Sequence, residues 1–472
     1  MNAQQANGPT ARLAAHVANV ANASLDARDV EAVRRLLLDN CIVSLWGATR
    51  PVAIEIADWT RRFAGSGSSP VLGREWTTEA SVAALAHGTA SHGFELDDTH
   101  NATASHPGSV IISSALAVAA EPGPPVESRH LLQAIAAGNE AMALIGIAAG
   151  GMSAVHRGLH PTALYGAYGS AATTLTLRAL RRGERMDAGP LTRAWGHALS
   201  QPSGLMQFSA EPTGGEVKRV HAGLGAHNGI RSADFAALPS VTAPRLVVEG
   251  AYGLAAVLAG PLAEIDLGGE LQIHRFSLKP YACCRLFHST IDALREATDG
   301  FALPVDAIAD ILVSGPTLVA EQHMTAAEST MTAQYSCPYV VGATLAYGPY
   351  AYEAYDEDHL RDPRIRAVAD RVRFAVDAEL EAAHYPEHFA SAVRLTLTDG
   401  SVRSALVVDS IGTAERPLTV AQIAAKGDGL AAHGLAGAGG RLVADIWSDA
   451  DDAAALIAPL QRESLLLASA RR

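Results

Sequence analysis

The first 270 or so residues repeat one pattern, in which small side chains alternate with larger apolar ones at helical spacing. The stretch 24–47 opens with a Ser/Asp pair suited to a helix N-terminus and then places Val30, Val33 and Leu37 on one face. The same texture returns in the segments 77–93, 106–121, 127–149, 160–180 and 215–238. Because alanine, glycine and serine allow helices to approach closely, we expect these segments to be central helices of a large bundle.

From about Leu271 the texture changes. The segments 271–284 and 307–316 resemble strands, and 392–408 predicts a hairpin that turns at Asp399–Gly400. Helical patterns intervene, and after Pro417 the chain is helical again. The sequence therefore predicts a mainly α protein. Residues 1–272 form the first part of an all-helical domain, residues 273–415 an inserted, smaller α+β lid domain, and residues 416–472 return to the helical domain.

Composition narrows the class of partner. The chain has 472 residues, of which 18% are charged, and a net charge of −13, so a polyanion such as nucleic acid finds no overall attraction. No secretory signal pattern is present, and the longest apolar run, 141–155, is too short and glycine-rich to span a membrane. Four cysteines do not make a disulfide framework. We expect a cytoplasmic protein that binds neither nucleic acid nor membrane.

Two His-Pro pairs point to chemistry. His106–Pro107 and His160–Pro161 each precede a helical pattern, and proline suits the first position of a helix. Each histidine should then lie at a helix N-terminus, where free N–H groups and partial positive charge attract carboxylates. Such a histidine can transfer a proton or hold an anion, although a surface histidine at a helix start is a simpler alternative.

A metal site is a rival explanation for the cluster around the first pair. Asp97, Asp98, His100 and His106 are ligand types, but their spacing matches no standard metal motif, and we expect no metal. The cysteines lack the CxxC spacing of an iron–sulfur site. A cysteine nucleophile at Cys284 stays open, without an evident histidine partner in the sequence.

Lysine is rare in this chain. Of 36 basic residues only Lys218, Lys279 and Lys426 are lysines. Lysine offers a compact ammonium with a tunable pKa, whereas arginine is a fixed planar fork. Lys218 lies near a predicted helix start, and Lys279 is followed by Arg285 and His288. These groups could hold substrate carboxylates, or they could be solvated surface charges.

The order of these motifs resembles the MmgE/PrpD family. The matching stretches are "HGTASHGFELDDTH" with the following "HP", "RGLHPTALYGAYGSAA", "GGEVKRVHAG", "KPYACCRLFH" and "YSCPYVVGATLAYG". The family includes 2-methylcitrate dehydratase, cis-aconitate decarboxylase and iminodisuccinate epimerase. The resemblance, over roughly residues 10 to 460, implies a helical domain, a smaller α+β lid, a cleft between them, a homodimer, and catalysis without metal or organic cofactor.

Carried over by motif, the resemblance implies a set of site residues: Glu95, Thr99, His106, His160, Lys218, Lys279, Cys284 and Tyr339. Two positions depart from the family. Glu95 replaces the usual aspartate of the acidic motif, and Cys284 stands where animal-type cis-aconitate decarboxylase has a histidine.

The resulting expectation is a cofactor-independent lyase that acts on a small di- or tricarboxylic acid by proton transfer at the carbon next to a carboxylate. His106 and His160 would transfer protons, assisted by Glu95 and Lys218. The substrate-binding residues would be Thr99, Lys279, Cys284, Arg285, His288 and Tyr339. An epimerase of an iminodisuccinate-like acid is the alternative, and a non-catalytic carboxylate-binding protein is a further one.

Overall fold

The computed structural model describes residues 8–211, 214–258, 262, 265–321, 327–448 and 450–470. Within them the chain divides into two compact units. The first contains the described parts of residues 1–206, 217–276 and 420–472, and the second contains the described parts of residues 207–216 and 277–419. The C-terminal segment thus belongs to the same unit as the N-terminal one. A mainly helical protein with a smaller α+β part is confirmed.

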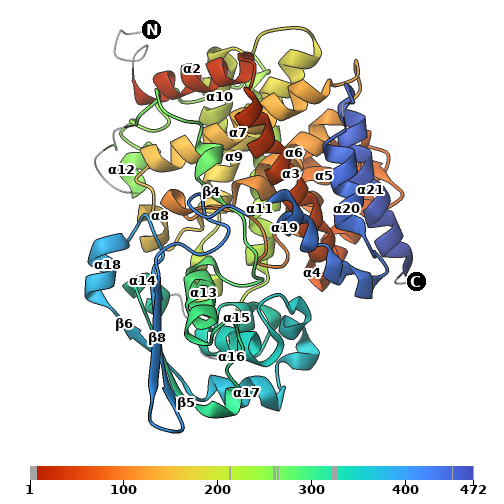
Figure 1. The fold of residues 1–472 in the computed structure, drawn as a ribbon. Helices are drawn as coiled ribbons and strands as arrows, with labels where there is room; N and C mark the ends of the chain where they lie inside the picture. The colour runs from red at the N-terminus through yellow and green to blue at the C-terminus, as the bar shows by residue number, and fades with distance from the viewer. Residues whose placement is uncertain are drawn as a thin grey trace. The chain divides into compact units, whose positions relative to one another are not determined.

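The first unit is almost entirely helical (Figure 1). Its helices are α2 (Pro9–Asn22), α3 (Ala27–Gly47), α4 (Pro51–Trp59), α5 (Ala80–Ser91), α6 (Pro107–Ala119), α7 (Ser128–Ala148), α8 (Ser153–His156), α9 (Pro161–Arg181), α10 (Ala188–Ala198), α11 (Val217–Ala236), α12 (Leu254–Leu258), α19 (Val420–Ala425), α20 (Ala438–Ile446) and α21 (Ala453–Ala470). Short strands β1 (Ser69–Pro70) and β2 (Thr77–Thr78) pair antiparallel, and β3 covers Thr99–His100. All five segments predicted as central helices are confirmed, as α5, α6, α7, α9 and α11.

Helices α5, α6, α9 and α11 pack against one another at the centre of this unit. Glycine permits the closest contacts: a Cβ atom added at Gly223 of α11 would lie 2.2 Å from the carbonyl oxygen of Leu85 on α5. The same helix approaches α9 at Gly225, where an added Cβ would lie 3.2 Å from the Cα of Gly166. These helices carry small residues on several faces, and the small residues therefore determine how closely the helices approach one another.

Helix α7 is long and apolar enough to cross a membrane by length and composition, but 94% of its apolar window is buried. It packs against α2, α6 and α9 inside the first unit. The apolar run at 141–155 forms its C-terminal part, the turn after it and the start of α8, so the packing of the helical core accounts for this hydrophobicity.

The second unit contains the main sheet. Its strands are β5 (Ile308–Gly315), β6 (Val372–Val376), β7 (Ser391–Leu397) and β8 (Val402–Val407), in the order β6-β5-β7-β8. Strand β6 is parallel to β5, and the other pairs are antiparallel. The helices are α13 (His288–Ala297), α14 (Thr317–Glu321), α15 (Thr330–Gln334), α16 (Cys337–Tyr347), α17 (Pro363–Ala369) and α18 (Ala378–His384). Helix α13 packs on β7 and β8.

The predicted hairpin is confirmed and the predicted first strand is largely wrong. Strands β7 and β8 turn at Asp399–Gly400, where Gly400 has φ +85° and the Asp399 carboxylate accepts the Ser401 N–H. The segment 271–284 instead forms a 3₁₀ turn over Gln272–Arg275 and the two-residue strand β4 (Phe276–Ser277). Only β4 is paired in this segment, with the two-residue strand β3, and Pro280 could not donate to a longer ladder.

Buried neutral imidazoles make the stability of this fold sensitive to acid. Burial lowers the pKa of His87 on α5 from 6.5 to about 4, although the hydrogen bond to the Pro70 carbonyl opposes the shift. The unfolded chain therefore binds more protons, and the His87 contribution to stability is complete above pH 6.5 and is lost as the pH falls toward 4.

We predict that His87→Gln reduces the loss of unfolding free energy between pH 7 and pH 4.5 by about 2–3 kcal/mol. Glutamine keeps a donor for the Pro70 carbonyl, so the change removes mainly the titration. Urea unfolding at both pH values measures it, with His388→Gln at a partly exposed imidazole as the control. An unchanged pH dependence in His87→Gln would show that this imidazole does not titrate in the expected window.

Candidate active site

In the first unit, three helix N-termini and one loop bring the predicted catalytic residues together. His106 is the N-cap residue of α6 and His160 that of α9, each followed by proline at the first helical position. Both predictions from the His-Pro pairs are thus confirmed. The His106 N–H donates to the Thr162 hydroxyl, 3.1 Å away, which ties the start of α6 to the start of α9.

The loop between α5 and α6 carries the acidic motif and is anchored on its apolar residues. Phe94 stacks on Trp46 of α3 with ring centroids 5.7 Å apart, and the Arg50 guanidinium lies 3.9 Å above the Phe94 ring. The Leu96 carbonyl accepts a hydrogen bond from Lys426, whose ammonium also contacts Asp39 at 2.5 Å. The third lysine therefore holds the loop in place, a role that its sequence context does not indicate.

Asp97 and Asp98 have different hydrogen-bonding roles in this loop. Asp97 Oδ2 accepts from His92 Nδ1 at 2.7 Å and from the Ser109 hydroxyl at 2.8 Å, and it lies 3.5 Å from His106 Nδ1. The Asp98 carboxylate accepts a hydrogen bond from the Gly108 N–H in the first turn of α6. The Asp98 backbone carbonyl accepts a hydrogen bond from His106 Nδ1, 2.8 Å away. One acid therefore orients an imidazole and the other caps a helix.

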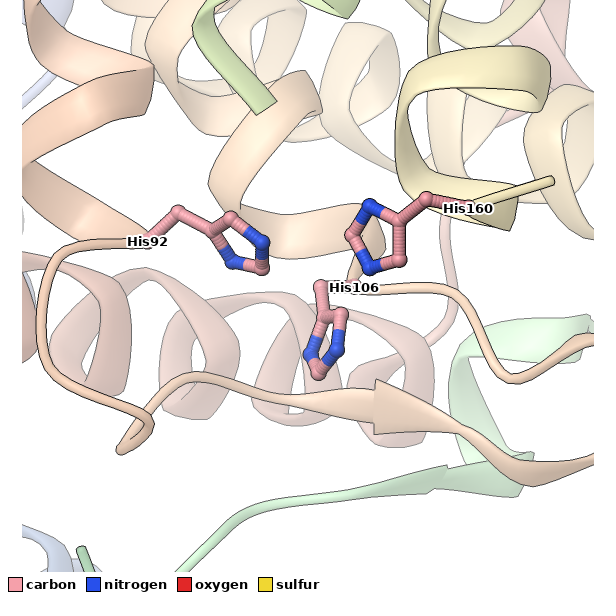
Figure 2. Close-up of side chains that lie close together, drawn as sticks. All are labelled: His92, His106 and His160. Carbon is pink, nitrogen blue, oxygen red and sulfur yellow. The ribbon is translucent and has the colours of Figure 1, made fainter. Parts of the chain in front are cut away.

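Three imidazoles lie together at this point: those of His92, His106 and His160 (Figure 2). Their ring centroids are 4.8 Å apart for His92 and His106, 5.6 Å for His92 and His160, and 6.0 Å for His106 and His160. His160 Nδ1 shares a hydrogen bond of 3.0 Å with Nδ1 of His221 on α11. All four side chains are buried.

The predicted set of site residues leaves out two of these buried histidines, His92 and His221. Burial holds the pKa of His92 well below its usual value, and the charge of Lys218 lowers it further while Asp97 opposes the shift. Burial and Lys218 lower the pKa of His221 to about 4. Both rings are thus neutral at neutral pH. Each lies inside one of the stretches that resemble the family, His92 in "HGTASHGFELDDTH" and His221 in "GGEVKRVHAG".

Glu95 and two cations form a buried ion cluster beside the imidazoles. The Glu95 carboxylate contacts the Lys218 ammonium and, at 2.6 Å, the Arg219 guanidinium, both from the first turn of α11. All three side chains are at most 1% exposed. Glu95 also has a positive φ of 53°, an uncommon conformation for glutamate that occurs at constrained sites. Lys218 is therefore near the predicted site, but its charge is matched by a carboxylate.

The Thr99 hydroxyl also belongs to this part of the first unit. It is buried, and its oxygen has no hydrogen-bond partner among the described residues. A buried hydroxyl without a partner costs free energy that a bound ligand can recover. The sequence prediction that Thr99 contacts substrate remains a prediction, and this open hydroxyl supports it.

The other predicted binding residues lie in the second unit. Lys279 and Cys284 are buried, and burial lowers the pKa of Arg285 to about 10 while Asp292 and Asp409 oppose the shift. Arg285 also donates to the Ser410 hydroxyl at 2.6 Å. Lys279 and Arg285 both exert a charge effect on the buried Cys283 thiol, so the two cations lie in one neighbourhood.

His288 and Tyr339 have partners inside the second unit. His288 Nε2 is 3.3 Å from the Cys283 carbonyl, and its ring packs on Tyr281. The Tyr339 hydroxyl donates to the Ala354 carbonyl at 2.7 Å, and burial raises the pKa of Tyr339. These contacts show both side chains supporting their own unit, and their predicted contact with substrate stays a prediction.

Comparisons with known proteins agree with this arrangement of motifs. The MmgE/PrpD N-terminal domain model matches residues 11–264, and the MmgE/PrpD C-terminal domain model matches residues 281–446. Cis-aconitate decarboxylase of Aspergillus terreus is 28% identical over 304 residues, which are 61% of this chain and 60% of that enzyme, so the match spans less than two thirds of its length.

Two further relatives are matched over more of their length. The cis-aconitate decarboxylase-like protein oryM of Aspergillus oryzae is 26% identical over 81% of this chain and 82% of its own. Human cis-aconitate decarboxylase is 24% identical over 80% of this chain and 78% of its own. Both halves of the family model match in their expected order and cover most of the sequence. The chain therefore belongs to the MmgE/PrpD family.

Proposed function

We propose that this protein is a lyase of the dehydratase or decarboxylase type that acts on a small tricarboxylic or dicarboxylic acid. The observation that carries the proposal is the group of buried imidazoles at the N-termini of α6 and α9, beside the ion cluster that Glu95 forms with Lys218 and Arg219 of α11. Family membership and the names of the relatives support the reaction class.

The proposed chemistry follows from where protons can move. In a dehydration, a neutral imidazole takes the proton from the carbon next to a carboxylate, and an imidazolium gives a proton to the departing hydroxyl, which leaves as water. In a decarboxylation, the carbon–carbon bond breaks, its electron pair stays on the substrate as CO₂ leaves, and an imidazolium protonates the carbon. His106 and His160 are the proposed proton-transfer pair in either reaction, with His92 and His221 in hydrogen-bond or ring contact with them.

The proposed reaction also requires stabilisation of the negative charge that develops on the substrate. The intermediate carries extra negative charge on a carboxylate that becomes an enediolate, and fixed donors and dipoles lower its free energy. The N-termini of α6, α9 and α11 supply partial positive charge in the first unit. Thr99 is the proposed donor to a substrate oxygen.

Proton NMR of the purified protein in D₂O tests the proposal directly. The panel is cis-aconitate, 2-methylcitrate, citrate, iminodisuccinate and simple 2-hydroxy acids. Loss of CO₂, formation of an alkene or its hydration supports the lyase. Deuterium entering iminodisuccinate without net conversion favours an epimerase instead. A ligand that raises the melting temperature without any exchange indicates a non-catalytic carboxylate-binding protein.

Lys279 of the second unit is a proposed carboxylate ligand, on the basis of its charge, its burial and its place beside Arg285. We predict that Lys279→Met raises KM for the substrate identified in the panel at least about tenfold and changes kcat less, because a lost charge-assisted hydrogen bond costs about 1.5–3 kcal/mol. Steady-state kinetics measure this, with Arg403→Met on the exposed face of β8 as the control. An unchanged KM removes Lys279 from substrate binding.

A further inference from the structure

The three imidazoles of His92, His106 and His160 have the spacing of metal ligands. One ring nitrogen of each lies within 4.8 Å of the others, and all three side chains are buried in the first unit. Figure 2 shows the His92 and His160 rings facing one another, with the His106 ring beside them. The ligand types that the sequence offered, Asp97, Asp98, His100 and His106, share only His106 with this group.

The ring positions are close to those of a tetrahedral zinc site. With zinc–nitrogen bonds of about 2.0–2.1 Å, three tetrahedrally arranged imidazoles have ring centroids about 5 Å apart. The observed separations are 4.8, 5.6 and 6.0 Å. The His92–His106 separation matches, and the His160 ring would have to move toward the other two to complete the geometry, with a fourth position left for water or a ligand atom.

Each ring already has the outer hydrogen bond that zinc-binding histidines usually make. His92 Nδ1 is bonded to the Asp97 carboxylate and His106 Nδ1 to the Asp98 carbonyl, while His160 Nδ1 is bonded to His221. The oxygen acceptors of His92 and His106 require an Nδ1–H donor and make Nε2 the ligand atom, and His160 offers Nε2 in the tautomer whose Nδ1–H donates to His221. His92 Nε2 is buried and has no hydrogen-bond partner among the described residues.

The surrounding side chains are of mixed charge. Glu95, Asp97 and Asp98 contribute three carboxylates, against the two cations Lys218 and Arg219. Among these five side chains the carboxylates exceed the cations by one, while the charge of Lys218 acts against a positive charge at His92. A divalent cation that enters this site loses water ligands, and coordination by the imidazoles replaces part of that hydration.

We propose that His92, His106 and His160 bind Zn²⁺, and that bound zinc inhibits the lyase reaction. The inhibition rests on the proposed function, because the metal would occupy nitrogens that the reaction needs for proton transfer. Zinc binding itself needs no substrate and is measured separately.

The experiment is calorimetric titration of the full chain with ZnCl₂, with Co²⁺ absorption spectra as a second readout of tetrahedral nitrogen coordination. A second group, His388, Asp409 and Glu415, could bind zinc in the second unit, so the reference protein carries His388→Gln. We expect this protein to bind one Zn²⁺, and a further His92→Gln to weaken binding at least about a hundredfold. His100→Gln, at a buried imidazole outside the group, is the matched control and should leave binding unchanged.

The outcomes test zinc binding and inhibition of the lyase reaction separately. Zinc binding that disappears with His388→Gln, or that persists in both His92→Gln and His160→Gln, overturns the site. Zinc binding by a protein with no lyase activity keeps the site and rejects the inhibition together with the proposed function. Lyase activity that zinc does not reduce in a zinc-saturated protein overturns the inhibition alone, whereas inhibition reversed by a chelator supports it.

Discussion

Replacing His106 with glutamine is expected to lower kcat at least about a hundredfold, the usual contribution of a positioned general acid or base. His106 lies at the N-cap of α6, within the imidazole group, and its Nδ1 is held by the Asp98 carbonyl. Glutamine can still donate to that carbonyl but cannot transfer a proton. The loss should therefore appear in kcat more than in KM, and the same change at His160 should act in the same direction.

The control for this prediction is His100→Gln in the same loop. His100 is also buried, and burial lowers its pKa to about 4, but its Nδ1 is bonded to the Thr103 hydroxyl and it lies outside the imidazole group. We expect its kcat to stay within a few-fold of the wild-type value. Urea unfolding of each variant shows whether the fold is intact. A folded His106→Gln protein with near-wild-type kcat would remove His106 from the mechanism.

The parts of this site that the sequence predicted are those set by local chemistry. Proline fixes φ and lacks an N–H, so the two His-Pro pairs locate two helix starts and the histidines that cap them. The Asp399–Gly400 turn is similarly local. These elements depend on a few neighbouring residues, and nothing distant in the chain needs to be known.

The rest of the site depends on tertiary packing. His221 meets His160 only because α11 packs on α9, and Lys426 reaches the Leu96 carbonyl from 330 residues away. The failure at 271–284 has the same origin, since alternating apolar residues can be buried in a loop as well as in a strand. His92 is the clearest example. Its hydrogen bond to Asp97 spans only five residues, but only the three-dimensional structure shows that its ring lies beside those of His106 and His160.

The second large effect is expected in stability, from Glu95→Gln. The substitution removes the carboxylate that Lys218 and Arg219 both contact, at a place where all three side chains are at most 1% exposed. Breaking a buried ion pair by neutralising one partner typically costs 3–5 kcal/mol, roughly, because a charge keeps its desolvation cost and loses its counter-charge. We predict a loss of that size in unfolding free energy, measured by urea unfolding at pH 7.

An exposed pair in the same unit is the control for Glu95. Glu79 and Arg231 are 3.4 Å apart and each 39% exposed, so Glu79→Gln should cost less than about 1 kcal/mol. A cost for Glu95→Gln in that same range would show that the buried cluster does not depend on this carboxylate.

Glu95→Asp separates charge from length, and it restores the residue that the family motif usually has. Aspartate keeps the carboxylate and is found more often than glutamate at positive φ, so the backbone at φ +53° should accept it well. The carboxylate would be one methylene further from α11, which weakens its contacts with Lys218 and Arg219. We expect Glu95→Asp to lose clearly less stability than Glu95→Gln. An equal loss would mean that the reach of the glutamate side chain, and not its charge alone, holds the start of α11 to the loop that carries the imidazoles.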